Sequence, residues 1–280
     1  MSIFKNETDY RVGWKILLAI LLYAAAMMLS IIPAILIYNF RDFTSLPEMV
    51  NLTMNSSIGN ALQAVFSIAI LWGICYLLVK KKAITWEKLG LDDSLSCALK
   101  KAGIGFICGA IVICVEIAVL CIFHYASLSK CSEGQNAIIA VTCGLVICAG
   151  IAFAEEVTFR GLIQGQFGED KKALGIAVTT ILFAAAHLLN THYTVYSLIY
   201  LLIGSLAFSL MRVVTKGLWF PIGFHMAWDW VEMSVFGLNQ EGTKHWFYVK
   251  GEEIPEYLIC AVLMLFVTAV LLLIYRKQKA

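Results

Sequence analysis

The sequence predicts an all-α fold: a polytopic membrane helix bundle of about eight transmembrane helices with both termini in the cytoplasm. Composition is the first observation behind this prediction. Of the 280 residues, 60% are hydrophobic and only 14% are charged, and the mean hydropathy is +0.81. A soluble domain carries roughly 25% charged residues, so this chain has too few to cover a water-soluble globule. The other two observations are a series of long apolar runs and a one-sided distribution of basic residues.

Apolar runs long enough to span a membrane occur along the whole chain, since a helix needs about 20 residues to cross the hydrocarbon core. They cover residues 12–38, 57–79, 102–124, 137–167, 173–190, 193–211, 218–238 and 254–275. The first run is too long for the apolar region of a cleavable signal peptide, about 7–15 residues, so we expect it to be a retained span. The fourth run is too long for an upright span. We expect it to tilt, to kink near Gly144 or Gly150, or to extend beyond the bilayer.

Basic residues obey the positive-inside rule when the N-terminus is placed in the cytoplasm. The inner segments then contain 16 Lys and Arg residues, and Arg160 lies inside a span. The outer segments contain 4, namely Arg41, Lys130, Lys244 and Lys250. This distribution favours two cytoplasmic termini and one integral membrane domain over residues 1–280. Because the basic residues lie in short loops between apolar runs, nothing supports a nucleic-acid partner.

The longest inner segment, 80–101, carries Trp86, Leu89 and Leu91 among charged residues. This pattern fits either a short interfacial helix or a solvated connector, and the sequence does not choose between them.

Cysteines and glycines inside the apolar runs are explained by helix packing. No two of the nine cysteines have the CxxC spacing of a zinc or redox motif, and seven lie within apolar runs, where cysteine behaves as a small hydrophobe. Gly105 with Gly109, and Gly161 with Gly165, have the small-xxx-small spacing that lets two helices approach closely.

Ionisable residues inside the spans are the strongest functional signal. A charge at the bilayer centre costs roughly 2.5–3.5 kcal/mol on insertion scales, so such residues face a bundle interior or a water-filled cavity and mark function by default. A concentrated set of such residues lies in three runs: Glu155, Glu156 and Arg160 in the fourth, His187 in the fifth, and His225, Asp229 and Glu232 in the seventh.

Helical spacing assigns different partners to the two glutamates. Glu156 and Arg160 are four residues apart with the acid first, the favoured orientation for an ion pair. Glu155 points about 100° away around the helix, which leaves it as the unpaired carboxylate. Glu155 lies 13 residues before Gly168 and His187 lies 15 residues after Lys172, so the two sit at nearly the same depth in a helical hairpin.

The seventh run adds a second group. His225, Asp229 and Glu232 follow i, i+4, i+7 spacing and share one helix face. Three helices can therefore direct a carboxylate, a histidine and a histidine–acid pair toward one point. Purely structural readings stay open: Glu156 with Arg160 fits a helix-locking ion pair, Asp229 fits a group that orients His225, and Glu232 fits either a structural or a functional role.

Three short motifs make the sequence resemble a known family. They are EExxxR at Glu155, Glu156 and Arg160, FxxxH at Phe183 and His187, and HxxxN/D at His225 and Asp229. Their order on three spans resembles the CPBP family, the CAAX prenyl protease and bacteriocin-processing group of intramembrane endopeptidases, also called the Abi family. The motif-bearing core covers about residues 137–238.

The resemblance implies a role for each motif position. Glu155 with His187 would activate the attacking water, and His225 with Asp229 would stabilise the tetrahedral intermediate or help to bind a metal. Glu156 and Arg160 would brace the helix that carries the first motif. An ionised Asp229 cannot donate to an oxyanion as the more common Asn can, which favours a role in orienting His225 or in ligating a metal.

Zinc is the cofactor that the resemblance leaves open. Glu155, His187 and His225 would form a zinc site with one open position. However, the sequence has no HExxH arrangement, the pattern that would make zinc compelling. We also expect a water-filled cavity that opens to the cytoplasmic side.

These observations favour an intramembrane endopeptidase that cuts a peptide or a prenylated, membrane-anchored protein near the cytoplasmic face. One alternative is a non-catalytic bacteriocin self-immunity or scaffold protein of the same fold. Another is a proton-coupled transporter, which would predict related halves, and the sequence shows no internal repeat. The compact chain with short loops favours a bacterial plasma membrane over the endoplasmic reticulum.

Overall fold

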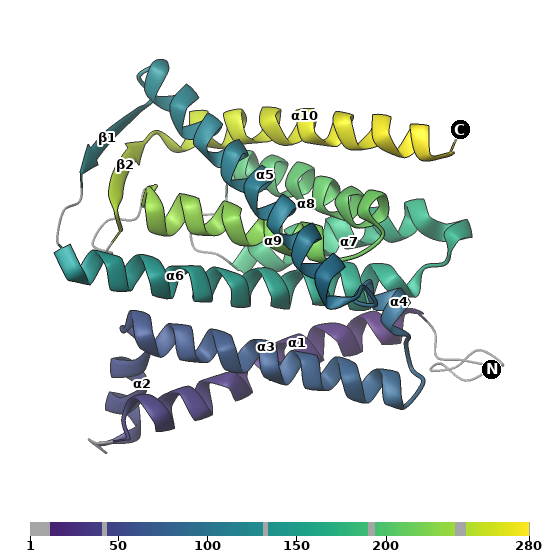
Figure 1. The fold of residues 1–280 in the computed structure, drawn as a ribbon, viewed down its shortest axis with the longest axis horizontal. Coiled ribbons are helices and arrows are strands. Elements are labelled where there is room, and N and C mark those ends of the chain that lie inside the picture. Colours follow the sequence, from purple (N-terminus) through teal and green to yellow (C-terminus); the bar gives the residue numbers. More distant parts are fainter. Residues whose placement is uncertain (1–11, 41–43, 131–133, 190–193, 239–244, 280) are drawn as a thin grey trace.

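The computed structural model is a bundle of helices with one small two-stranded sheet, so the predicted all-α class is confirmed (Figure 1). It describes residues 12–40, 44–130, 134–189, 194–238 and 245–279. The eight cysteines in these ranges are free, and Cys131 lies outside the described residues.

Each predicted span corresponds to a helical segment. These segments are α1 (Val12–Tyr38), α3 (Ser57–Lys80), α5 (Leu95–Ile122), α6 (Gly134–Glu155) with its continuation, α7 (Lys172–Ala186), α8 (Val195–Thr215), α9 (Trp219–Asp229) with its continuation, and α10 (Glu253–Lys279). The chain reverses direction from each of these segments to the next (Figure 1).

The number of complete spans differs from the prediction. Among the described residues, six helices are long and apolar enough to cross a membrane. The fifth and seventh segments are shorter, since α7 has 15 residues, while α9 has 11 and is followed by a π-helix of 6, η5 (Trp230–Val235). At about 1.5 Å per residue, α7 extends only about 22 Å, less than the hydrocarbon core of about 30 Å. The count of eight full spans is therefore not confirmed.

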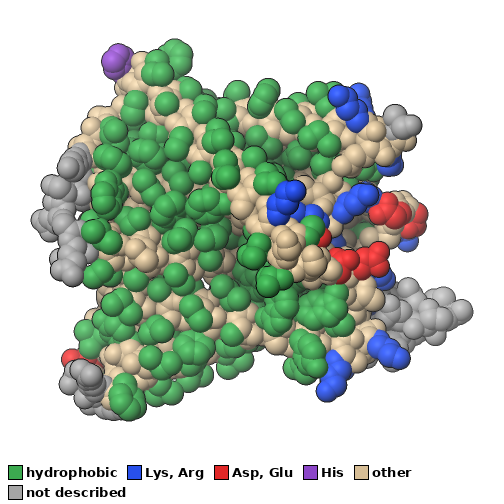
Figure 2. Space-filling model, in the orientation of Figure 1, with side chains coloured by type: hydrophobic (Ala, Val, Ile, Leu, Met, Phe, Trp, Pro, Cys, Tyr) green, Lys and Arg blue, Asp and Glu red, His purple; other side chains and the backbone are tan. Residues whose placement is uncertain are grey.

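Basic side chains gather at one end of the bundle, near the start of α1 and the end of α10 (Figures 1 and 2). The opposite end holds the antiparallel pair of β1 (Ala126–Lys130) and β2 (Phe247–Gly251). This one-sided arrangement agrees with the positive-inside pattern of the sequence. The sidedness of the termini itself stays a prediction.

The fourth segment departs from regular geometry at the functional motif rather than at a glycine. The α6 helix continues through Gly144 and Gly150. At Glu156 it changes into a π-helix, η1 (Glu156–Ile163), followed by the 3₁₀ turn η2 (Gln164–Gln166). π-helical segments inside α-helices are rare, and those that occur often lie at functional sites. Here one contains Glu156 and Arg160.

Close packing of α5 on α9 fixes the helix that carries His225. A Cβ atom at Gly105 or Gly109 would collide with the carbonyl oxygen of Phe220 or Phe224 on α9. Gly223 on α9 is equally close to the backbone of α5. The interpretation of the small-xxx-small pair as a helix contact is therefore confirmed.

The segment 80–101 contains a short helix, α4 (Trp86–Leu89), with Gly90 in the left-handed region at φ 75°. Leu89 and Leu91 are buried, and the backbone N–H of Leu218 donates to the Gly90 carbonyl. The helical interpretation of this segment is confirmed. However, α4 packs onto η1 as part of the core, so it is more than a solvated connector.

Three further elements have no counterpart in the prediction: the two β-strands and α2 (Leu46–Met54). The side chain of Asn39 links α1 to α2, because its amide donates to the Met49 carbonyl and to the Thr53 hydroxyl. These elements lie at the end of the bundle opposite the basic side chains (Figure 1).

Candidate active site

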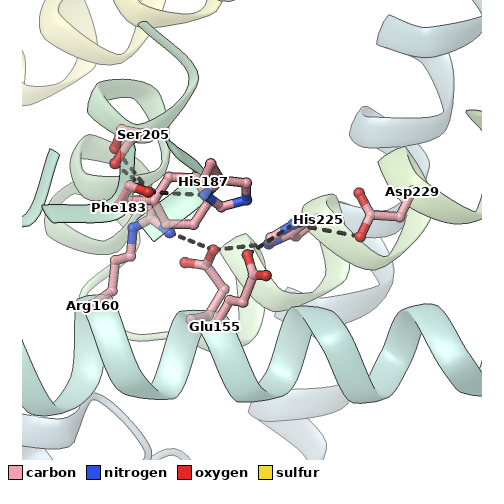
Figure 3. A network of polar contacts seen from close by, with 8 residues as sticks. Glu155, Arg160, Phe183, His187, Ser205, His225 and Asp229 are labelled. Carbon is pink, nitrogen blue, oxygen red and sulfur yellow. Dashed lines mark hydrogen bonds and ion pairs between the residues drawn. The ribbon is translucent and has the colours of Figure 1, made fainter. Parts of the chain in front are cut away.

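A buried chain of polar contacts begins at Arg160 and ends at His225 (Figure 3). Arg160 Nη1 donates to Glu156 Oε1 at 2.9 Å, and the same oxygen lies 3.0 Å from His225 Nδ1. Arg160 and Glu156 are completely buried. The predicted ion pair is thus present. It lies within η1, and its carboxylate also contacts one ring nitrogen of His225 on the seventh segment.

The other nitrogen of His225 faces two more carboxylates. Glu155 Oε2 lies 3.8 Å from His225 Nε2, and Asp229 Oδ2 lies 3.5 Å from the same atom. Figure 3 shows Glu155 and Asp229 on opposite sides of the ring. The neighbouring residues Glu155 and Glu156 therefore contact the two nitrogens of one imidazole, and Asp229 is placed as expected beside His225.

The His187 side chain bonds back to the last turn of α7, the helix that it follows. Its Nδ1 lies 2.9 Å from the carbonyl oxygen of Phe183, and its ring lies on the Phe183 ring with centroids 4.6 Å apart. The Arg160 guanidinium lies 4.5 Å from the centroid of the same Phe183 ring. Phe183 thereby connects His187 to the buried ion pair, which gives the first position of the FxxxH motif a physical role.

The α8 helix contributes residues that the sequence analysis did not single out. Arg160 Nη2 donates to the hydroxyl oxygen of Ser205 at 2.9 Å and to its carbonyl oxygen at 3.2 Å. One turn further along, Gln164 Nε2 donates to the Ser209 carbonyl at 3.2 Å. Two serines four residues apart inside an apolar span are the signal that could have indicated this polar contact.

Phe208, also on α8, closes the site from one side. Its ring centroid lies 4.9 Å from that of His225, and the Arg160 guanidinium lies 5.2 Å from it. Such aromatic contacts restrict the orientation of both cations and imidazoles. Nothing in the spacing of an ordinary apolar span marks this phenylalanine in advance.

All four predicted catalytic residues, Glu155, His187, His225 and Asp229, line one cavity of about 530 Å³. Its other lining residues extend along α8, η5 and the first turns of α10, toward the end of the bundle that carries β1 and β2. Glu232 lines the same cavity. We expected the cavity to open toward the cytoplasmic side, the basic end of the bundle, but its lining residues lead toward the opposite end.

The expected pairing within the site also differs in detail. Glu155 lies within ion-pair distance of His225, and the contacts among the described residues do not join it to His187. Both side chains nevertheless line the same cavity.

Glu155, His187 and His225 do not fit zinc in this arrangement. Among the described residues, no group of three or more His, Cys, Asp or Glu side chains is placed to hold a metal ion. Nδ1 of each histidine is engaged, by Phe183 and by Glu156 respectively, so only Nε2 of each ring could face a metal. We therefore assign no catalytic step to a metal, and the zinc site remains a hypothesis from the motif types.

Comparison with known proteins gives one match. A family model described as type II CAAX prenyl endopeptidase, Rce1-like, matches residues 136–231, a stretch that contains all three motifs. No curated protein and no solved structure matches the chain significantly.

Proposed function

Since the match over residues 136–231 confirms the resemblance to the CAAX-protease family of intramembrane endopeptidases, we propose that this chain hydrolyses a peptide bond with water activated by Glu155. The observation that supports the proposal best is the chain of contacts from Arg160 through Glu156 to His225, with Glu155 next to it at the cavity wall.

The contacts of His225 determine which nitrogen carries its proton. Glu156 is paired with Arg160 and accepts hydrogen bonds. His225 Nδ1 therefore donates to Glu156, and Nε2 is the nitrogen that exchanges a proton with the cavity. A proton on Nε2 can be shared with Glu155 or Asp229, at 3.8 and 3.5 Å. Asp229 then orients the charged imidazole, the role of a carboxylate beside a catalytic histidine.

His187 has the same tautomer for a different reason. A backbone carbonyl can only accept, so Nδ1 of His187 donates to Phe183. The neutral ring then presents an unprotonated Nε2 that can accept a hydrogen bond from water. We propose that His187 positions the water and that Glu155 takes its proton.

The reaction balances with these groups alone. Water attacks the carbonyl carbon while one of its protons passes to the Glu155 carboxylate. The negative charge that develops on the carbonyl oxygen is stabilised by the Nε2–H of protonated His225. The C–N bond then breaks, and the proton on Glu155 passes to the leaving nitrogen to give an amine and a carboxylic acid.

The substrate that suits this site is a peptide segment held at a membrane. Glu155 lies 11 residues before the end of η2, so at about 1.5 Å per residue it lies roughly 16 Å from the basic end of its helix, about half of the 30 Å hydrocarbon core. We therefore propose that a prenylated or otherwise membrane-anchored protein presents the bond within the bilayer. Cleavage from the cytoplasmic side remains the prediction of the basic-residue distribution.

The test is cleavage of a fluorogenic, farnesylated peptide with a CaaX ending by the purified full chain, compared with its unprenylated counterpart. Glu155→Gln keeps size and polarity but removes the proton acceptor, and loss of a general base should lower the single-turnover rate about 100–10,000-fold. His187→Ala should lower it comparably, and the double variant should be little worse, because residues that act as a unit are not additive.

Glu169→Gln is the matched control, since Glu169 is exposed on the turn Glu169–Lys171, and this variant should cleave normally. Near-normal cleavage by Glu155→Gln would refute the proposed mechanism. If Glu155→Gln abolishes cleavage but leaves a bacteriocin-resistance phenotype intact, the biological role is immunity rather than proteolysis.

A further inference from the structure

A second cavity lies at the basic end of the bundle, apart from the catalytic residues. It is a groove with a volume of about 540 Å³. Its walls are formed by α1, by the end of α3 with the turn that follows it, and by η1 and η2. None of the residues that line it lines the catalytic cavity. Its walls are mainly apolar, with Leu18 and Leu22 on α1, Leu78 on α3 and Leu162 on η1.

Charge along this groove changes in the same direction on both of its helices. On α1, Lys15 precedes Leu18 and Leu22. Leu78 on α3 precedes Lys81, which follows the end of that helix. The α1 helix runs away from the basic end of the bundle and α3 runs toward it (Figure 1). Both lysines therefore lie at the basic end of the groove, and the leucines lie deeper in the bundle.

This gradient has the polarity of a membrane lipid. An acyl chain fits the apolar depth, and an anionic headgroup fits the two lysines at the end that faces the cytoplasm in the predicted topology. Gln166 at the same end adds an amide that can donate to a phosphate oxygen. Basic pockets between membrane helices on the cytoplasmic side are suited to anionic headgroups.

We propose that the groove between α1, α3 and η1 is a binding site for an anionic glycerophospholipid of the cytoplasmic leaflet. Lys15 and Lys81 bind the phosphate, and the leucine-lined depth holds part of an acyl chain. The bound lipid fills the space between α1 and the helical segment that carries Glu156 and Arg160. The site is therefore placed to support the packing of α1 against η1, which are in contact.

The experiment is native mass spectrometry of the full chain with equal amounts of phosphatidylglycerol and phosphatidylcholine bearing identical acyl chains. We expect the protein to retain phosphatidylglycerol selectively and to melt at a higher temperature in its presence. A basic residue contributes about a 5-fold preference for anionic lipid, so Lys15→Gln with Lys81→Gln should reduce the selectivity about 25-fold.

Two further variants separate this site from general surface attraction. Lys100→Gln with Lys277→Gln removes the same charge from exposed positions at the same end, away from the groove, and should keep the selectivity. Leu18→Trp, at a 48% exposed position on the groove wall, should reduce lipid retention while both lysines remain.

Three results would overturn the proposal. The unaltered protein could retain both lipids equally, in which case the groove holds bulk acyl chains. The Lys100/Lys277 control could lose as much selectivity as the Lys15/Lys81 variant. Inorganic phosphate alone could raise the melting temperature as much as phosphatidylglycerol, in which case the lysines bind a free anion.

Discussion

Replacement of Arg160 by methionine is the sharpest test of how the site is held together. Arg160→Met keeps a long, unbranched side chain but removes the charge and every donor. In the unaltered protein the guanidinium donates to Glu156 and to both oxygens of Ser205, and it lies over Phe183 and Phe208. The substitution therefore breaks contacts that join η1, α7 and α8.

The expected loss follows from burial. Arg160 and Glu156 are both completely inaccessible to solvent, so the substitution leaves a buried carboxylate whose cation is gone. Breaking a buried pair on one side costs about 3–5 kcal/mol. For a chain of this size, each kcal/mol corresponds to roughly 2–4 °C in melting temperature, so we expect Arg160→Met to melt about 6–20 °C lower.

Thermal unfolding of detergent-purified variants, with folded yield as a second readout, measures this change. Lys172→Met is the matched control, because Lys172 pairs with Glu169, which is 85% exposed, and exposed pairs contribute only about 0.2–1 kcal/mol. Adding Glu156→Gln to Arg160→Met removes the unpaired charge and should recover part of the lost stability. An Arg160→Met protein as stable as the Lys172→Met control would show that the buried pair does not brace the bundle.

Three other predictions follow from the packing, the topology and the metal question. Gly109→Ala should lower stability and cleavage together, because its methyl group would push away the helix that carries His225, whereas Gly103→Ala on the same helix meets open space and should be neutral or more stable by about 0.5–1 kcal/mol; equal effects of the two would contradict the close crossing. In a cysteine-free background, Asp92→Cys should be labelled only from the cytoplasmic side and Ser127→Cys only from the outside; labelling of position 92 from outside would overturn the topology. A chelator should leave the cleavage rate of the purified protein unchanged, and loss of activity that zinc restores would show that the described arrangement changes to bind a metal.

The positions of the helical segments could be predicted because a long apolar run is a strong and local signal. The first span ends at the predicted residue, Tyr38. The ends of the fifth span could not be predicted equally well. Its α-helix stops at Ala186 because His187 begins a 3₁₀ turn and bonds back to the Phe183 carbonyl, and both depend on side-chain geometry.

Elements that form through distant contacts left no signal in the sequence. The strands β1 and β2 are separated by more than 100 residues, pair with each other, and carry polar residues that interrupt any apolar pattern. The π-helix at Glu156–Ile163 is likewise stabilised from outside, by contacts of Arg160 and Gln164 with α8. Local propensity does not specify such a segment.

The site shows the same division between local spacing and tertiary geometry. Spacing along one helix correctly paired Glu156 with Arg160 and placed Asp229 beside His225, because residues four apart share a helix face. It could not determine which histidine each glutamate approaches across the bundle. That choice depends on the rotation of α9, which the glycine contacts with α5 fix.

Two adjacent glutamates can serve different purposes because they differ in what surrounds them. Glu156 is completely buried beside Arg160, and its carboxylate oxygen lies 3.0 Å from His225 Nδ1. Glu155 lies at the cavity wall, 3.8 Å from His225 Nε2, with a side chain that is 14% exposed. An acid that is fixed by a buried cation can orient a histidine but cannot exchange protons easily, whereas an acid that reaches a cavity can do so. In the proposed mechanism the paired glutamates of the motif divide orientation and proton transfer between them, and of the two it is Glu155 that lines the cavity where water can reach it.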